Sequence, residues 1–197
     1  MTISEIFNKE GEHIFRQKEK ECLDFLIDHN NLIISTGGVM PCINESIDVM
    51  NEMGETINYL QPNSQVIVMA AAVSDFRKNS PTSQKISKEL FLNSIFTDLE
   101  MTPDLIQNQT KKKLKSQIFL GFAAETGSDS EIKEKGEKKR ILKGCDLLMA
   151  NPIDRDGQGF DQNHNSGFLL GPKKMVKDLS LSTKLSISHQ LLDEIQN

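Results

Sequence analysis

The 197-residue sequence has no tryptophan and one tyrosine, so it lacks the aromatic side chains that a stacking platform for single-stranded nucleic acid uses. Its net charge of -5 gives the chain as a whole no electrostatic attraction for nucleic acid. Its three cysteines have no CxxC spacing, and its four histidines are scattered. These features predict reduced thiols in a cytoplasmic protein that binds no nucleic acid and has no metal-ligand set of its own.

Long apolar runs are also missing. No stretch approaches the roughly 20 residues that cross a membrane, so no membrane partner is expected. The N-terminal sequence MTISEIFNKEGEH is acidic and polar, unlike a signal peptide. The phosphate-loop pattern GxxxxGK[ST] does not occur. The composition, 37% hydrophobic and 26% charged, is that of a globular domain long enough to bury a core.

Strand and helix patterns alternate along most of the chain. This alternation predicts an α/β fold with a doubly wound, mostly parallel, Rossmann-like sheet and a C-terminal flap or hairpin. Strands are predicted at 31–35, 66–69, 117–121, 146–150, 168–170 and 175–179, and helices at 3–29, 44–60, 130–143 and 182–195. Thr102 is predicted to cap a further helix, with Pro103 at its first position and Asp104 in its first turn.

The stretch Gln65–Arg77, QVIVMAAAVSDFR, carries the most functional information. Its β-branched apolar run predicts a strand buried on both faces, and small residues and Asp75 follow that run. The pattern recurs at Gln117–Thr126, QIFLGFAAET. Ligands of open α/β sheets bind at the carboxyl ends of strands, so two neighbouring strands of this kind would frame one crevice. The alternative is a small-residue packing patch with a turn aspartate.

Two groups of lysines suggest an anionic ligand. Lys139 and Lys143 are four residues apart, hence on one helical face, and two ammonium groups in that position suit a polyphosphate. The loop 77–88 holds Lys78, Lys85 and Lys88, which form either an anion-binding loop or an ordinary solvated surface. The other charges of the helix are expected to face water.

Six motifs occur in one order: AAAVSDF at 70–76, KIS at 85–87, TPDL at 102–105, GFAAET at 121–126, KKRILKGCDLLMAN at 138–151 and GFDQNHN at 159–165. Together they resemble phosphopantothenoylcysteine synthetase, the ligase half of the bifunctional coenzyme A biosynthesis flavoprotein. The resemblance covers about residues 54–196. It implies joining 4'-phosphopantothenate to cysteine through an acyl-cytidylate, with CTP as co-substrate and Mg²⁺ as cofactor.

The resemblance also implies roles for individual residues. Lys85 would be catalytic, near the phosphates. The nucleotide would be bound by Met69, Ala70, Ala71, Asp75, Thr102, Pro103, Asp104, Leu105, Phe122, Lys139 and Lys143. A homodimer is expected, in which a flap such as 151–165 completes the neighbour's site.

The first sixty residues follow a different pattern. EGEHIFRQKEKE at 10–21 and LIISTGGVMPC at 32–42 resemble shikimate kinase, which would place Arg16, Gly37 and Gly38 in a substrate site. Without a phosphate loop there is no means of positioning ATP, so kinase activity is not expected. We find neither the glycine-rich strand-turn nor the asparagine with which the ligase family begins.

The interpretation is a chimera, with a kinase-like fragment at 1–55 joined to a ligase-like region at 56–197 in one composite domain. An active ligase, a CTP-binding module without activity, an inactive kinase remnant and a partly folded fusion all remain open.

Overall fold

The computed structural model describes residues 9, 11, 14, 17, 21, 57, 58, 60–70, 76–78, 99–158 and 162–196. The chain divides into two compact units, Met1–Gly38 and Val39–Asn197. The five described residues of the first unit are helical, within the helix predicted at 3–29. The predicted strand 31–35 lies outside the described residues, and the predicted division at residue 55 stays a prediction. The second unit contains all the elements discussed below.

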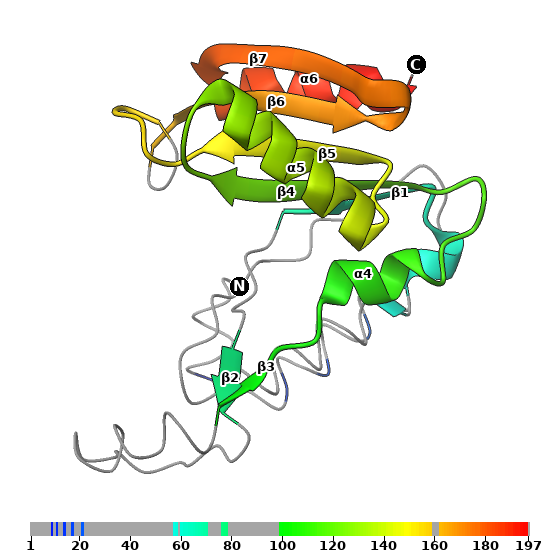
Figure 1. The fold of residues 1–197 in the computed structure, drawn as a ribbon. Helices are drawn as coiled ribbons and strands as arrows, with labels where there is room; N and C mark the ends of the chain where they lie inside the picture. Colours follow the sequence, from blue (N-terminus) through cyan, green and yellow to red (C-terminus); the bar gives the residue numbers. More distant parts are fainter. Residues whose placement is uncertain are drawn as a thin grey trace. The chain divides into compact units, whose positions relative to one another are not determined.

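Five strands of the second unit form one sheet. They are β1 (Val66–Met69), β4 (Ile118–Glu125), β5 (Leu147–Pro152), β6 (His164–Gly171) and β7 (Met175–Thr183), in the order β1-β4-β5-β6-β7. β1, β4 and β5 are parallel, and β6 and β7 extend them as an antiparallel hairpin around the short 3-10 helix η2 (Pro172–Lys174) (Figure 1). The predicted α/β fold with a C-terminal hairpin is therefore confirmed.

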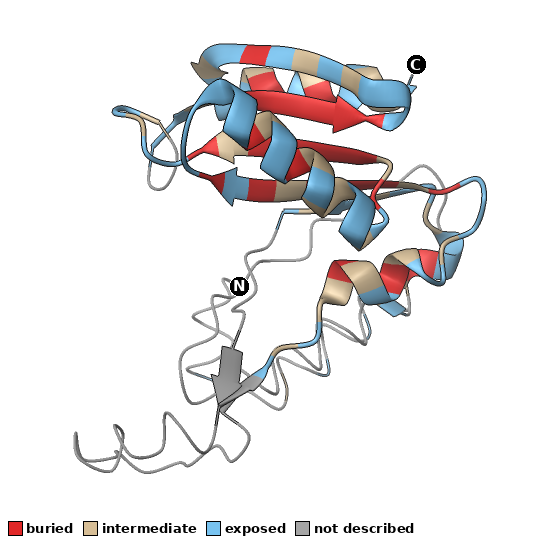
Figure 2. Ribbon diagram, in the orientation of Figure 1, coloured by how far each residue is buried: buried red, intermediate tan, exposed pale blue. Residues whose placement is uncertain are grey.

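Two helices cover opposite faces of this sheet. Neighbouring residues of a strand point to opposite sides, so the apolar strands present two apolar faces that helices can bury. α5 (Asp129–Lys143) buries Ile132 against Leu148 and its neighbours on one face. α6 (Lys184–Gln196) buries Ile187 against Leu147 and its neighbours on the other. Figure 2 shows that burial concentrates in the strands between the two helices. The doubly wound arrangement is thus present, and the core lies on both sides of β4, β5 and β6.

Local sequence sets both ends of α5 and its distance from the sheet. Ser128 caps its start in a reciprocal capping box with Glu131, and Gly144 ends it in the left-handed conformation at φ 69°. In the middle, a Cβ on Gly136 would lie 2.6 Å from Leu170 Cδ1 and 2.7 Å from Ala150 Cβ. The missing side chain therefore lets the helix backbone approach the sheet closely.

The other elements are shorter. The 3-10 helix η1 (Gln61–Asn63) precedes β1, and α4 (Leu105–Thr110) precedes β4. β2 (Phe76–Lys78) and β3 (Leu99–Met101) form a separate antiparallel pair. Of the helix predicted at 44–60, the described residues 57, 58 and 60 are helical. In the part of the chain that the structure describes, no helix is long and apolar enough to cross a membrane.

Several predictions about the strands were wrong in detail. β5 runs to Pro152 rather than 150, β6 spans His164–Gly171 rather than 168–170, and β7 runs to Thr183 rather than 179. β1 is not buried on both faces: Val66 is 37% exposed and Val68 is 46% exposed. Neighbouring residues of a strand point to opposite faces, and in β1 only Ile67 and Met69 pack against a described core cluster. β4 does not end at Gly121 but continues to Glu125, because its pairing with β5 extends to Glu125 opposite Pro152.

The predicted helix start at Thr102 was also wrong. Asp104, with extended backbone angles, is the N-cap of α4, and its side chain accepts a hydrogen bond from the Gln107 N–H at 3.0 Å. Thr102 and Pro103 precede the helix. A carboxylate is as good an N-cap as a hydroxyl, and it also compensates the positive end of the helix dipole. The helix therefore starts after Asp104, two residues later than predicted.

Candidate functional site

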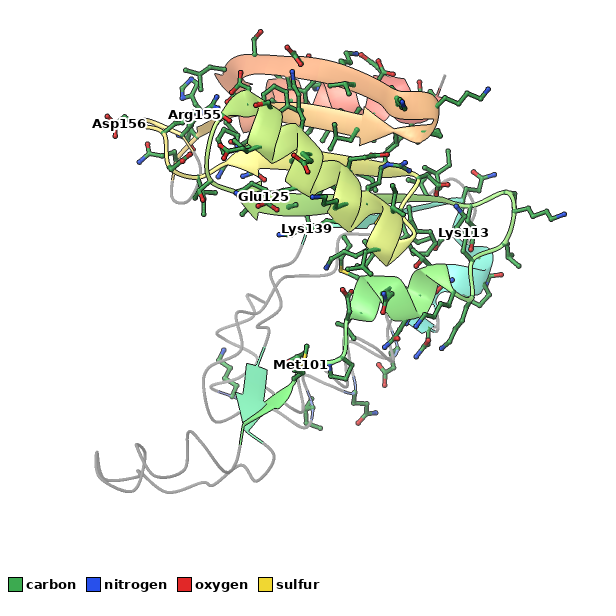
Figure 3. All side chains as sticks on the ribbon, viewed as in Figure 1. Met101, Lys113, Glu125, Lys139, Arg155 and Asp156 are labelled. Atoms are coloured by element: carbon green, nitrogen blue, oxygen red, sulfur yellow. The ribbon has the colours of Figure 1, made fainter. Side chains whose placement is uncertain are left out.

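The two lysines predicted to bind phosphates both form ion pairs with carboxylates of this chain. Lys139 Nζ lies 2.6 Å from Glu125 Oε1, and Lys143 Nζ lies 2.9 Å from Asp104 Oδ2. The lysines come from the last turns of α5, whereas the carboxylates come from the end of β4 and the cap of α4. Figure 3 shows Glu125 and Lys139 next to each other. An anionic ligand at this site would therefore compete with two internal carboxylates.

The two pairs differ in burial. The Glu125 side chain is 9% exposed, whereas that of Asp104 is 34% exposed. Glu125 Oε1 makes no hydrogen bond of ordinary geometry, so the ion pair with Lys139 is its described compensation. Burying a carboxylate without a partner is costly, and removing one member of a buried pair leaves that cost in place. The Glu125–Lys139 pair is thus the harder one to separate.

α4 docks against the C-terminal end of α5 and positions Asp104. Gln107 Nε2 donates to the Leu142 carbonyl at 2.9 Å, and the Thr110 hydroxyl donates to the Lys143 carbonyl. Both bonds satisfy carbonyls that the last turn of a helix leaves without partners. Asp104 caps α4 through Oδ1 and pairs with Lys143 through Oδ2, so one carboxylate links the two helices.

Met69 lies on the same face of the sheet as α4. Its side chain packs against the cluster of Ile106, Phe119 and Cys145. At Gly121, opposite Met69 in the sheet, a Cβ would lie 3.1 Å from Cys145 Sγ and 3.2 Å from Ile106 Cδ1, so these neighbours would have to shift by a few tenths of an ångström. The small residue at 121 thus allows close packing, and ligand binding by this pattern stays a prediction.

Cys145 does not act as a nucleophile in this cluster at neutral pH. It is buried, with 4% of its surface exposed. Burial raises the pKa of its thiol to about 11, against the smaller lowering effect of Lys143. Since the thiolate is the reactive form, the side chain behaves as a small apolar group.

Other predicted residues occupy different surroundings. Phe122 packs partly against the α6-side cluster, so its side chain points to the face opposite Ile106. Ala70 is exposed just after β1, and Leu105 is partly buried at the start of α4. The hydroxyl oxygen of Thr102 is buried and has no hydrogen-bond partner among the residues that the structure describes.

The structure leaves several predicted residues untested. Ala71, Asp75, Lys85, Arg16, Gly37 and Gly38 lie outside the described residues. The recurrence of a strand-end carboxylate is therefore established at Glu125 only. The sequence marked Glu125 as a strand-end carboxylate but did not place it among the site residues, because its pairing with a lysine 14 positions later depends on how α5 crosses the sheet.

A separate hollow of about 370 Å³ lies beside the start of α5 and the hairpin. Its lining includes Asp129, Arg155, Ser166 and Phe168, with Arg155 and Asp129 forming an ion pair. None of the predicted site residues lines it. Over the described ranges, no group of three or more His, Cys, Asp or Glu side chains is arranged to hold a metal ion.

Comparison with protein families gives one match over most of the chain. The model described as "DNA/pantothenate metabolism flavoprotein C-terminal domain" matches residues 40–197. That match starts ahead of residue 54, where the motif resemblance begins. The shikimate kinase resemblance of the first sixty residues stays a prediction.

Curated relatives agree with this match. The chain is 30% identical over 144 residues to a coenzyme A biosynthesis bifunctional protein CoaBC of Bacillus subtilis, covering 73% of this chain and 34% of that protein. It is 31% identical over 152 residues to the Escherichia coli K12 protein of the same name, covering 76% of this chain and 36% of that protein. The chain thus spans about a third of the length of these relatives.

Solved structures share the fold. The C-terminal domain of a CoaBC protein matches with a TM-score of 0.55 and 25% identity, over 74% of this chain and 62% of that one. A Cab2 mutant in complex with phosphopantothenate-cysteine matches with a TM-score of 0.53 over 100% of this chain and 65% of that one. At 13% identity, the second likeness concerns the fold alone.

Proposed function

The chain belongs to the DNA/pantothenate metabolism flavoprotein C-terminal domain family, and on that basis we propose that it binds CTP and joins 4'-phosphopantothenate to cysteine. The observation that carries the proposal is the pair of ammonium groups on the last turns of α5, Lys139 and Lys143, beside the end of β4. A related fold has been solved with phosphopantothenate-cysteine, the compound that such a reaction forms.

The proposed reaction has two steps. A carboxylate oxygen of phosphopantothenate attacks the α-phosphorus of CTP, and the bond to the bridging oxygen breaks to release pyrophosphate. The cysteine amine then attacks the acyl carbon, loses a proton and displaces CMP. Lys139 and Lys143 would neutralise the charge that develops on the leaving pyrophosphate, which is the largest electrostatic demand of the first step.

The described residues fit a Mg²⁺ ion that arrives with the nucleotide. A magnesium–nucleotide complex takes one or two carboxylates from a protein, and the phosphates and water supply the other ligands. Glu125 offers a strand-end carboxylate whose Oε1 is paired with Lys139 Nζ at 2.6 Å, so the ion would take the place of that lysine. The ion would supply charge neutralisation at the phosphates, and Glu125 is the described residue placed to hold it.

A binding module without ligase activity is the second candidate. The sequence contains neither the glycine-rich strand-turn nor the asparagine with which the ligase family begins, and that asparagine would act on the acyl-cytidylate rather than bind the nucleotide. The carboxylate partners of Lys139 and Lys143 weaken phosphate binding in either candidate. The predicted catalytic residue Lys85 and a homodimer with a shared flap belong to the ligase proposal.

Pyrophosphate release separates these two functions. The ligase proposal predicts release only when CTP, phosphopantothenate, cysteine and Mg²⁺ are all present, with CTP rather than ATP as the effective nucleotide. Binding of CTP without pyrophosphate release would support the binding module. Absence of both would contradict the nucleotide site.

A further inference from the structure

The burial of Glu125 creates a charge problem for any ligand that takes Lys139. The Glu125 carboxylate is 9% exposed and Lys139 Nζ lies 2.6 Å away, while the lysine itself is 44% exposed. The lysine can therefore turn outward toward solvent, but the carboxylate cannot follow it. If phosphate oxygens draw Lys139 away, a buried negative charge is left behind.

Such a charge needs a replacement cation. A buried carboxylate without compensation is much less favourable than one that is paired, so the loss of Lys139 must be offset at Glu125 itself. A divalent cation that accompanies the phosphates supplies that charge at the same place. Carboxylate oxygen is also a ligand that Mg²⁺ accepts.

We propose that Glu125 is a specificity-determining residue: it holds Lys139 in the absence of ligand and so makes binding of a polyphosphate depend on a divalent cation. The proposal rests on the nucleotide site proposed above and assigns Glu125 a role in it. A metal-free polyphosphate has to separate the buried pair without compensation. A polyphosphate with its cation exchanges one positive charge for another.

The second ion pair provides a matched comparison within the same site. Asp104 also holds a lysine, but its side chain is 34% exposed and its Oδ1 keeps the hydrogen bond from the Gln107 N–H when Lys143 leaves. Water can therefore compensate Asp104. Release of Lys143 should require no cation at Asp104, although both pairs have the same chemistry.

The test is a calorimetric titration of the full chain with CTP, with and without Mg²⁺, for the wild type and for Glu125→Gln and Asp104→Asn. The quantity compared is the ratio of the metal-free Kd to the Kd with Mg²⁺. We expect Glu125→Gln to bind metal-free CTP about tenfold more tightly, because no buried ion pair has to be separated. The ratio should therefore fall about tenfold. In Asp104→Asn the ratio should stay within about twofold of the wild-type value.

An unchanged ratio in Glu125→Gln, with CTP still bound, overturns this inference and leaves the proposed function standing. Failure of every folded protein to bind CTP overturns the nucleotide site and the inference together. Thermal melting of Lys139→Met gives an independent readout, because its Glu125 has lost its cation. Millimolar Mg²⁺ should raise the Tm of this variant more than that of the wild type, and an equal shift contradicts the proposal.

Discussion

Substitution of Gly136 by alanine tests how tightly α5 is packed against the sheet, because two physical effects predict opposite signs. Alanine is the better helix former, and this effect alone would stabilise the protein by about 1 kcal/mol. The new Cβ, however, would lie 2.6 Å from Leu170 Cδ1 and 2.7 Å from Ala150 Cβ. Carbon atoms in good contact lie about 3.5–4.0 Å apart, so the helix or the sheet must move by about 1 Å.

We expect the packing effect to exceed the helix propensity. Overpacking of a core costs about 1–3 kcal/mol, and both contacted groups belong to buried residues, Ala150 at 0% and Leu170 at 1% exposure. The net expectation is therefore a destabilisation of up to about 2 kcal/mol. Urea unfolding followed by far-ultraviolet circular dichroism measures it, with Lys138→Ala on the exposed side of α5 as a control expected to change stability by about 0.5 kcal/mol or less. A Gly136→Ala protein more stable than the wild type would refute the close approach of α5 to the sheet.

Two further predictions concern the junction of α5 with α4. Gly144→Ala should destabilise the protein by about 1–2 kcal/mol in urea unfolding, because φ is 69° and a Cβ would lie 2.9 Å from Thr110 Oγ1; no loss would contradict this C-cap. The pKa of Cys145 is about 11 in the fold against an ordinary 9.0, so the folded state holds the thiol proton more tightly. The resulting stability is present below pH 9 and is lost as the pH rises through 11, by about 1.4 kcal/mol for each pKa unit. The free energy of unfolding, measured from pH 8 to 11, should therefore fall more steeply with pH in the wild type than in Cys145→Ala. Parallel curves for the two proteins would contradict the burial of the thiol.

The order of the sheet strands and of α5 and α6 was predictable because strong local signals mark it, whereas β2 and β3 were not predicted and β2 includes Arg77 and Lys78 of the predicted loop 77–88. Apolar runs in β4 and β5 and the closing glycine of α5, Gly144, are local in sequence. Strand and helix ends were predicted less well, since they depend on partners. β4 continues through small residues because β5 pairs with them as far as Pro152. α4 begins after Asp104 because that carboxylate can cap the helix and also reach Lys143.

The nucleotide site itself stays a prediction. The spacing of Lys139 and Lys143 placed both on one helical face, but their carboxylate partners on elements beside α5 were not predicted. Which carboxylates they meet depends on how α5 crosses β4 and α4, and no local pattern specifies a crossing. For the same reason, the sequence did not predict that Glu125 pairs with Lys139 or that the Phe122 side chain lies on the face opposite Ile106.

The affinity of Lys143→Ala for CTP in the presence of Mg²⁺ tests the central claim most directly. Lys143 is the better lysine to remove, because its partner Asp104 is partly exposed and keeps its capping bond, so the fold should survive. A hydrogen bond to a charged group contributes about 1.5–3 kcal/mol, so the account predicts a loss of affinity of about tenfold to a hundredfold. Lys138→Ala, whose lysine pairs with Glu134 on the exposed side of α5, should bind CTP like the wild type. Equal affinity for CTP in all three proteins would contradict a nucleotide site at the end of α5.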